Sequence, residues 1–227
     1  MDVLALFHGS EAIVSKPEIG LCRPYNDYGK GFYCTADQEL GKEWACQKGH
    51  DGFVSSYELS LDGLVAIDLN DEGFTALHWL SVLFENRLVR LTTPVMERGG
   101  RWLLEHFSVD LKAADIVAGY RADDSYFGFA RAFLSNSITL GQLTRALRLG
   151  NLGTQVMLKS PAAFDAIRFT GYVKADAATY FPLYSERDAR ARSEFAQMVC
   201  SSEEQDDGLF LSSLMEMGKE ELDVCLR

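Results

Sequence analysis

The stretch YGKGFYCT, residues 28–35, gathers three aromatic residues and two glycines around a single lysine. Gly29-Lys30-Gly31 supplies neither a phosphate-binding P-loop nor a dinucleotide fingerprint, since both need a different glycine spacing. What remains is a glycine-lined approach to an aromatic face, which suits a flat ring stacked on Tyr33. Trp44, in the predicted helix that follows, is a candidate for the opposite face. The alternative is an aromatic mini-core at a tight turn.

Short apolar runs separated by turn signals lie on both sides of this stretch. Residues 53–60 alternate with period two, and residues 64–69 are predicted to be their hairpin partner. The other predicted strands are 3–7, 31–35, 115–119, 154–158 and 166–172. Helices are predicted at 37–47, 74–89, 141–149, 185–199 and 209–226. Many short strands with inserted helices and no regular βαβ order predict an α+β fold.

The charge is unevenly distributed along the chain. The 227 residues carry a net charge of −11, of which −6 falls on residues 171–227. A balance this acidic excludes a general nucleic-acid binder and disfavours anionic membrane surfaces. We therefore expect a body over residues 1–172 and an acidic helical extension over 173–227, packed on or beside it. The acidity of the extension suits a solvated face or a surface for a basic protein partner.

Neither a membrane anchor nor a metal site is expected. The first seven residues lack the basic segment and long apolar run of a secretory signal, and no stretch of about 18 apolar residues occurs. The five cysteines are odd in number and form no C-x-x-C pair, which favours reduced thiols.

Two of these segments carry a family resemblance. LFHGS at residues 6–10 and YGKGFY at residues 28–33 resemble the histidine–tyrosine class of ADP-ribosyltransferases, which includes the diphtheria-toxin-like and poly-ADP-ribose polymerase families. In that class a second aromatic residue follows the tyrosine by 11 positions, and Trp44 stands there. The chain looks most similar to a bacterial family catalogued as a domain of unknown function. Further blocks that match it are Trp79 with Asn86-Arg87, DIVAG at residues 115–119, and Ala122-Asp123-Asp124.

The resemblance covers roughly residues 4 to 170 and implies an ADP-ribosyltransferase-like split β-sandwich around an NAD cleft, with residues 1–172 as the catalytic domain. It implies that His8 hydrogen-bonds the adenosine ribose, that the Gly9 backbone holds the nicotinamide amide, and that Tyr33 and Trp44 sandwich the nicotinamide. Arg87 is a candidate for the pyrophosphate or for a core carboxylate. The implied NAD-binding set is His8, Gly9, Ser10, Lys30, Gly31, Tyr33, Trp44 and Arg87.

The chain departs from the class at its third position. Where the class has a glutamate on a late strand, Gln155 stands, which can hydrogen-bond a ribose hydroxyl but cannot carry negative charge. Chain elongation is therefore not expected, whereas single transfer is. Asp123 or Asp124 is a candidate substitute base, or alternatively a helix cap. The predicted catalytic set is His8, Tyr33, Gln155, Asp123 and Asp124.

The function implied by the resemblance is mono-ADP-ribosylation of a protein acceptor, with NAD as substrate and no metal. The leading named acceptor is a threonine hydroxyl of host ubiquitin, modified by a bacterial effector that is made in the bacterial cytoplasm and delivered to the host cytosol. One alternative is a toxin of a toxin–antitoxin pair with a bacterial target, and another is a non-catalytic scaffold. A third is a two-histidine phosphoesterase built on residues 8–10 (HGS) and 106–108 (HFS).

Overall fold

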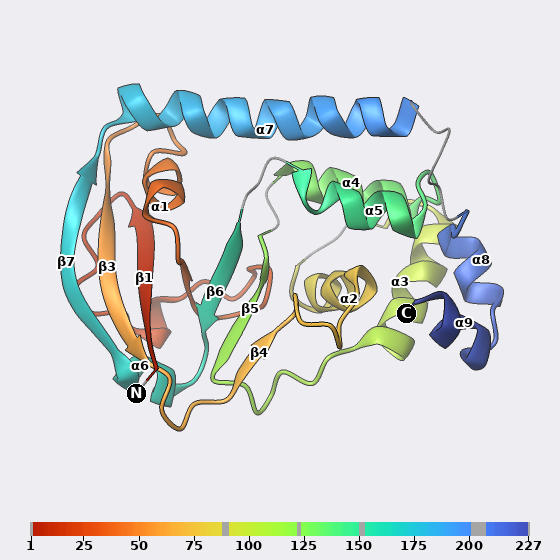
Figure 1. Ribbon diagram of the computed structural model, residues 1–227, viewed down its shortest axis with the longest axis horizontal. Coiled ribbons are helices and arrows are strands. Elements are labelled where there is room, and N and C mark those ends of the chain that lie inside the picture. The colour runs from red at the N-terminus through yellow and green to blue at the C-terminus, as the bar shows by residue number, and fades with distance from the viewer. Residues whose placement is uncertain (1, 88–90, 122–123, 150–152, 201–207, 227) are drawn as a thin grey trace.

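The computed structural model describes residues 2–87, 91–121, 124–149, 153–200 and 208–226. Over these residues one seven-stranded mixed sheet runs in the order β4-β5-β6-β2-β1-β3-β7, with helices gathered mainly beyond one end of it (Figure 1). The strands are β1 (Val3–Ser10), β2 (Phe32–Thr35), β3 (Gly52–Ser60), β4 (Ala66–Asp68), β5 (Ile116–Tyr120), β6 (Thr154–Leu158) and β7 (Ile167–Ala175). The predicted α+β class is confirmed at this level.

The helices account for most of the remaining chain. They are α1 (Gln38–Ala45), α2 (Ala76–Asn86), α3 (Pro94–Phe107), α4 (Asp124–Leu134), α5 (Leu140–Ala146), α6 (Pro161–Ala166), α7 (Ala177–Cys200), α8 (Leu211–Glu216) and α9 (Lys219–Cys225), with a 3-10 turn η1 (Ile19–Leu21). Side-chain caps start several of them: Asp37 accepts the backbone N–H groups of Glu39 and Leu40, and Thr75 forms a capping box with His78. No helix among the described residues is both long and apolar enough to cross a membrane.

One predicted pairing is wrong. Residues 64–69 were expected to form a hairpin with residues 53–60, but the strand found there, β4, pairs in parallel with β5. Both edges of β3 are occupied instead, by β1 on one side and by β7 on the other. Since a strand has only two hydrogen-bonding edges, β4 is left to pair elsewhere.

The sheet divides between β1 and β2. Within the described chain these two strands pair in register at one position, Phe7 opposite Thr35, whereas β1 pairs with β3 along its whole length from Val3 to Ser10. The β7-β3-β1 part and the β2-β6-β5-β4 part are therefore joined near Phe7 and separate toward Ser10. This separation creates the space for the cavity described below.

Helix α1 packs closely on β1 because of a glycine. A Cβ on Gly9 would lie 2.0 Å from the carbonyl oxygen of Gly41 and 2.8 Å from the nitrogen of Ala45, both on α1. Only a residue without a side chain fits at this contact. The absence of a Cβ at Gly9 thus serves the contact with α1, and the ligand contact that the resemblance implies for the Gly9 backbone stays a prediction.

The C-terminal helices share the main hydrophobic core rather than standing apart. Ala191 of α7, Leu211 and Leu214 of α8, and Leu222 of α9 belong to the same buried cluster as Trp79 on α2. A helix was predicted at residues 185–199, and the observed helix α7 is longer, since it begins at Ala177 and continues through a proline. The predicted helix at 209–226 is two helices that separate at residues 217–218.

Helix α7 lies along one side of the molecule, from the β7 end over α1 to α4 and α5 (Figure 1). It is held to α1 by Arg187, which donates to both oxygens of Glu43 at 2.6 and 2.8 Å. The Glu43 side chain is 5% exposed, so this is a bidentate pair on a buried carboxylate. The helix thereby ties the two parts of the fold together.

Candidate functional site

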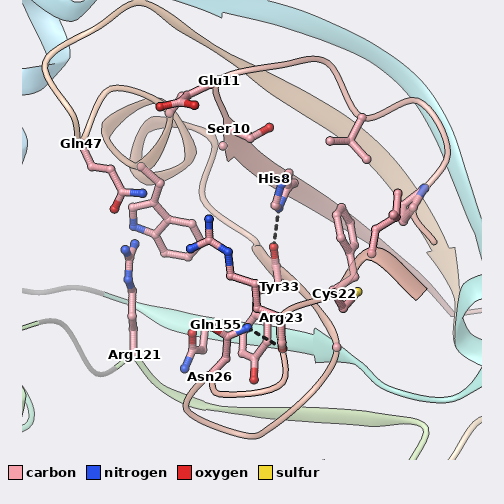
Figure 2. Close-up of a pocket in the computed structure, with 18 of the residues that line it drawn as sticks. His8, Ser10, Glu11, Cys22, Arg23, Asn26, Tyr33, Gln47, Arg121 and Gln155 are labelled. Carbon is pink, nitrogen blue, oxygen red and sulfur yellow. Dashed lines mark hydrogen bonds between the residues drawn. The ribbon is translucent and has the colours of Figure 1, made fainter. Parts of the chain in front are cut away.

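A cavity of about 650 Å³ lies where β1 and β2 separate. Figure 2 shows side chains from several elements converging on it, including His8 of β1, Tyr33 of β2 and Gln155 of β6. The predicted site residues that line it are His8, Gly9, Ser10, Gly31, Tyr33, Trp44, Arg87 and Gln155. A volume of this size is typical of a small-molecule or cofactor site.

Three predicted residues are not placed at the cavity. Lys30 is exposed and is not among the residues that line it. Asp123 lies outside the described residues, and Asp124 is the first residue of α4 but its side chain is not among those described. The role assigned to the Asp123-Asp124 pair therefore stays a prediction.

His8 is fixed by a hydrogen bond across the division of the sheet. Its Nδ1 lies 2.7 Å from the backbone carbonyl oxygen of Tyr33, and a carbonyl can only accept, so Nδ1 carries the proton. Burial lowers the pKa of His8, while the bond to Tyr33 opposes that shift in part. The neutral ring thus has Nδ1 as donor and Nε2 as acceptor, available to receive a hydrogen bond from a hydroxyl. The ring packs on Phe32, with centroids 4.4 Å apart.

Tyr33 is held by the turn that precedes it. Its hydroxyl donates to the carbonyl of Gly29 at 2.7 Å and accepts from the backbone N–H of Tyr28 at 3.0 Å. Burial raises the pKa of this phenol, so it stays protonated at neutral pH. Gly29 makes the turn possible because its φ of 92° lies in the region that favours glycine. The ring is therefore presented in a fixed orientation beside the cavity.

Trp44 carries a cation on its face. The Arg121 guanidinium carbon lies 3.9 Å from the centroid of the indole ring, and both residues line the cavity (Figure 2 labels Arg121). The indole is 8% exposed. Stacking on an aromatic face holds a guanidinium in one orientation. The expected stacking of a nicotinamide ring between Tyr33 and Trp44 stays a prediction, because one face of Trp44 is already used.

A carboxylate lies at the cavity beside Gln155. The Nε2 of Gln155 donates to Oδ2 of Asp27 at 2.8 Å and to the carbonyl of Tyr120 at 3.2 Å. The Nε of Arg87 lies 3.1 Å from Oδ1 of the same aspartate, and its guanidinium stacks on Phe127. This contact matches one of the two roles that the sequence left open for Arg87, as partner of a buried carboxylate, and its place in the cavity lining leaves the pyrophosphate role a prediction.

The charge of the cavity differs from that of the whole chain. Its lining includes five basic and three acidic side chains, a net charge of +2, although the chain carries −11. The basic residues are Lys16, Arg23, Lys48, Arg87 and Arg121, and the acidic ones are Glu11, Glu18 and Asp27. A locally positive cleft attracts anionic ligands even on an acidic protein.

Sequence reasoning missed Asp27 and Arg121. Asp27 immediately precedes the YGKGFY block, and Arg121 follows the strand that holds DIVAG, so both were adjacent to matched blocks. Tyr184 of α7 also lines the cavity, which shows that the C-terminal extension contributes to it. Nothing in the local sequence distinguished Arg121 or Tyr184 from an ordinary surface residue until β5 and α7 were placed at the cavity.

The second histidine of the phosphoesterase alternative lies elsewhere. His106 is on α3, is exposed, and bonds the carbonyl of Trp102 one turn earlier through Nδ1. It is not among the residues that line the cavity with His8. Within the described residues, no group of three or more His, Cys, Asp or Glu side chains is placed to hold a metal ion.

The fold and the cavity define an α+β protein whose candidate site lies at a division of a mixed sheet. Residues 4–169 match the family described as "Protein of unknown function (DUF3990)", and the chain belongs to that family. Comparison with curated proteins gave no match. Comparison with solved structures gave none either.

Proposed function

We propose that this protein is an NAD-dependent mono-ADP-ribosyltransferase that acts on a protein acceptor, with the cavity between β1 and β2 as its NAD site. The single observation that carries the proposal is the convergence on one cavity of His8, Gly9, Tyr33, Trp44 and Gln155. The family resemblance assigns NAD contacts to the first four of these residues and puts Gln155 at the third catalytic position of the class. The five residues come from four separate elements. A division of the sheet at that point also agrees with a split β-sandwich.

The residues present suit the parts of NAD. The Nε2 of His8 is an acceptor for a ribose hydroxyl, because Nδ1 already donates to Tyr33. Arg87 and Arg121 bring guanidinium groups to a lining of net +2, which favours a ligand with two phosphates. The fixed ring of Tyr33 offers an apolar surface for the nicotinamide.

The proposed reaction transfers ADP-ribose in a single step of substitution. The bond between ribose C1′ and the nicotinamide nitrogen breaks, and nicotinamide leaves as a neutral molecule with the bonding electron pair. The acceptor oxygen forms a new bond to C1′, and the proton of that hydroxyl passes to water. Positive charge builds up on the ribose in between, so the site works mainly by positioning the ring and stabilising charge.

The leading acceptor candidate is a threonine hydroxyl of ubiquitin. The acidic extension, with a net charge of −6 over residues 171–227, suits a basic protein partner. Both a host target and a bacterial target are compatible with this surface, so the acceptor is to be decided by experiment.

The test separates NAD chemistry from acceptor choice. The full chain is incubated with NAD, and nicotinamide release is followed without and with ubiquitin; intact-mass analysis then looks for an ADP-ribose adduct on ubiquitin. The proposal is supported if the wild type releases nicotinamide and the His8→Ala and Tyr33→Ala variants do not. Thermal unfolding checks that both variants fold. Equal NAD turnover in the wild type and both variants would reject it. NAD turnover without a ubiquitin adduct removes ubiquitin alone.

A further inference from the structure

The aspartate beside Gln155 occupies an unusual environment for a charged group. The Asp27 side chain is 8% exposed, and it lies among aromatic residues, with Tyr28 and Tyr33 following in the same segment. Burying a carboxylate costs several kcal/mol unless partners compensate for the lost hydration. Here the guanidinium of Arg87 and the amide of Gln155 supply that compensation, at 3.1 and 2.8 Å. These two partners therefore stabilise the Asp27 carboxylate at the cavity.

Gln155 is suited to holding that carboxylate rather than to replacing one. Its side-chain nitrogen donates to two acceptors, the Asp27 carboxylate and the carbonyl of Tyr120, and the residue is 4% exposed. Because both partners only accept, the amide nitrogen must face them. A glutamate at position 155 would place a second carboxylate against the first and against a carbonyl. An amide side chain at position 155 therefore fits these two acceptors, whereas a carboxylate does not.

Both residues are anchored by the strands that border the cavity. On β6, Gln155 stands opposite Thr35 of β2 and opposite Gly119 of β5, in the middle of three paired strands. Asp27 belongs to the segment that leads into β2, and the next residue, Tyr28, is 2% exposed. The two side chains thus meet from segments 128 positions apart, inside the cavity lining.

We propose, building on the proposed function, that Asp27 is the catalytic carboxylate of this site and that Gln155 is the residue that positions it. Asp27 takes over the negative charge that related transferases place at the position of Gln155. During transfer it faces the ribose whose C1′–nitrogen bond is breaking, and its charge stabilises the positive charge that develops there. Asp27 gains no proton in this step, since the proton of the acceptor hydroxyl passes to water.

The experiment measures nicotinamide release from NAD by the full chain, as kcat and KM, for the wild type, Asp27→Asn and Gln155→Glu. We expect Asp27→Asn to lower kcat by roughly 100-fold or more, as the loss of one charge-stabilising group does, with KM changed little. Gln155→Glu is expected to lower kcat at pH 7.5 and to recover relative to the wild type as the pH falls. Two adjacent carboxylates share a proton at lower pH, which restores a single negative charge.

Glu43→Gln is the matched control. It removes another buried, arginine-paired carboxylate, on α1, which is not among the cavity-lining residues. This variant is expected to lower the unfolding temperature and leave kcat unchanged. If Asp27→Asn does not fold, the pH dependence of Gln155→Glu decides.

The outcomes separate the two proposals. A wild type that turns over NAD together with an Asp27→Asn variant within about threefold of its kcat rejects the role of Asp27 and leaves the proposed function standing. A Gln155→Glu variant that is more active than the wild type at pH 7.5 also rejects the role of Asp27 and leaves the proposed function standing. A wild type that neither binds nor turns over NAD rejects the proposed function, and the role of Asp27 with it.

Discussion

His8 donates its Nδ1 proton to the backbone carbonyl of Tyr33 across 2.7 Å, at the place where β1 and β2 stop pairing. A side chain thus spans a gap that backbone hydrogen bonds no longer close. The same bond fixes which ring nitrogen faces a ligand, so the geometry of the sheet and the chemistry of the cavity depend on one contact.

His8→Asn is the most direct probe of this contact. The asparagine amide nitrogen can keep the bond to the Tyr33 carbonyl, but the acceptor at Nε2 is lost. We expect NAD to bind about 2- to 10-fold more weakly, as the loss of one neutral hydrogen bond predicts, with the fold retained. Calorimetric titration measures the affinity and circular dichroism checks the fold. Unchanged affinity would show that Nε2 does not contact the ligand.

The pH dependence of stability follows from the lowered pKa of His8. A histidine whose pKa is lower in the folded state takes up a proton more readily when unfolded. The contribution of His8 is therefore complete above the ordinary value of 6.5 and declines as the pH falls below it. The wild type should lose stability relative to His8→Asn between pH 7.5 and 5, measured by thermal unfolding of both proteins. A constant difference in Tm over that range would contradict it.

Arg121→Met tests the guanidinium that rests on Trp44. Methionine keeps an apolar contact with the indole and removes the charge. A charge-assisted hydrogen bond to a phosphate is worth about 1.5–3 kcal/mol, so NAD affinity should fall roughly 10- to 100-fold. Arg168→Met is the control, because Arg168 is an exposed residue on β7 paired with Glu58 and is not among the cavity-lining residues. Equal affinities of the two variants would show that Arg121 is not a ligand contact.

Gly9→Ala tests the contact between β1 and α1. The added Cβ would meet the Gly41 carbonyl at 2.0 Å, so either the helix or the strand must move. Overpacking of this kind costs about 1–3 kcal/mol in the free energy of unfolding, which urea denaturation measures. Gly20→Ala serves as the comparison, since a Cβ there meets nothing within 4 Å. A Gly9→Ala variant as stable as Gly20→Ala would show that β1 and α1 can move apart here at little cost in free energy.

Arg187→Met tests the attachment of α7. In Arg187→Met, Glu43 stays a buried carboxylate but loses the guanidinium that offsets its lost hydration. Breaking such a pair lowers the free energy of unfolding by about 3–5 kcal/mol. The double variant Glu43→Leu/Arg187→Met should regain much of this stability, because no charge then remains buried. Urea unfolding of the two variants side by side gives both values, and equal losses in the single and double variants would argue against the explanation.

The sequence was informative where one local pattern fixes one element. The alternation of residues 53–60 predicted β3, and the apolar run at 154–158 is β6 as predicted. The pairing of residues 64–69 was wrong because the partner of a short strand depends on which edges are still open. The resemblance identified His8, Tyr33 and Trp44, which line one cavity. It did not reveal Asp27, whose proposed role depends on a contact with a residue 128 positions away.

Helix α7 has a practical consequence for how this family is studied. The family match ends at residue 169, yet Arg187, the partner of a buried glutamate on α1, and Tyr184, a wall of the cavity, both lie beyond it. A fragment cut at the family boundary would leave Glu43 without its arginine and the cavity without one side. The unit recognised by sequence comparison is thus shorter than the unit that folds. An expression fragment of this protein should therefore extend through α7.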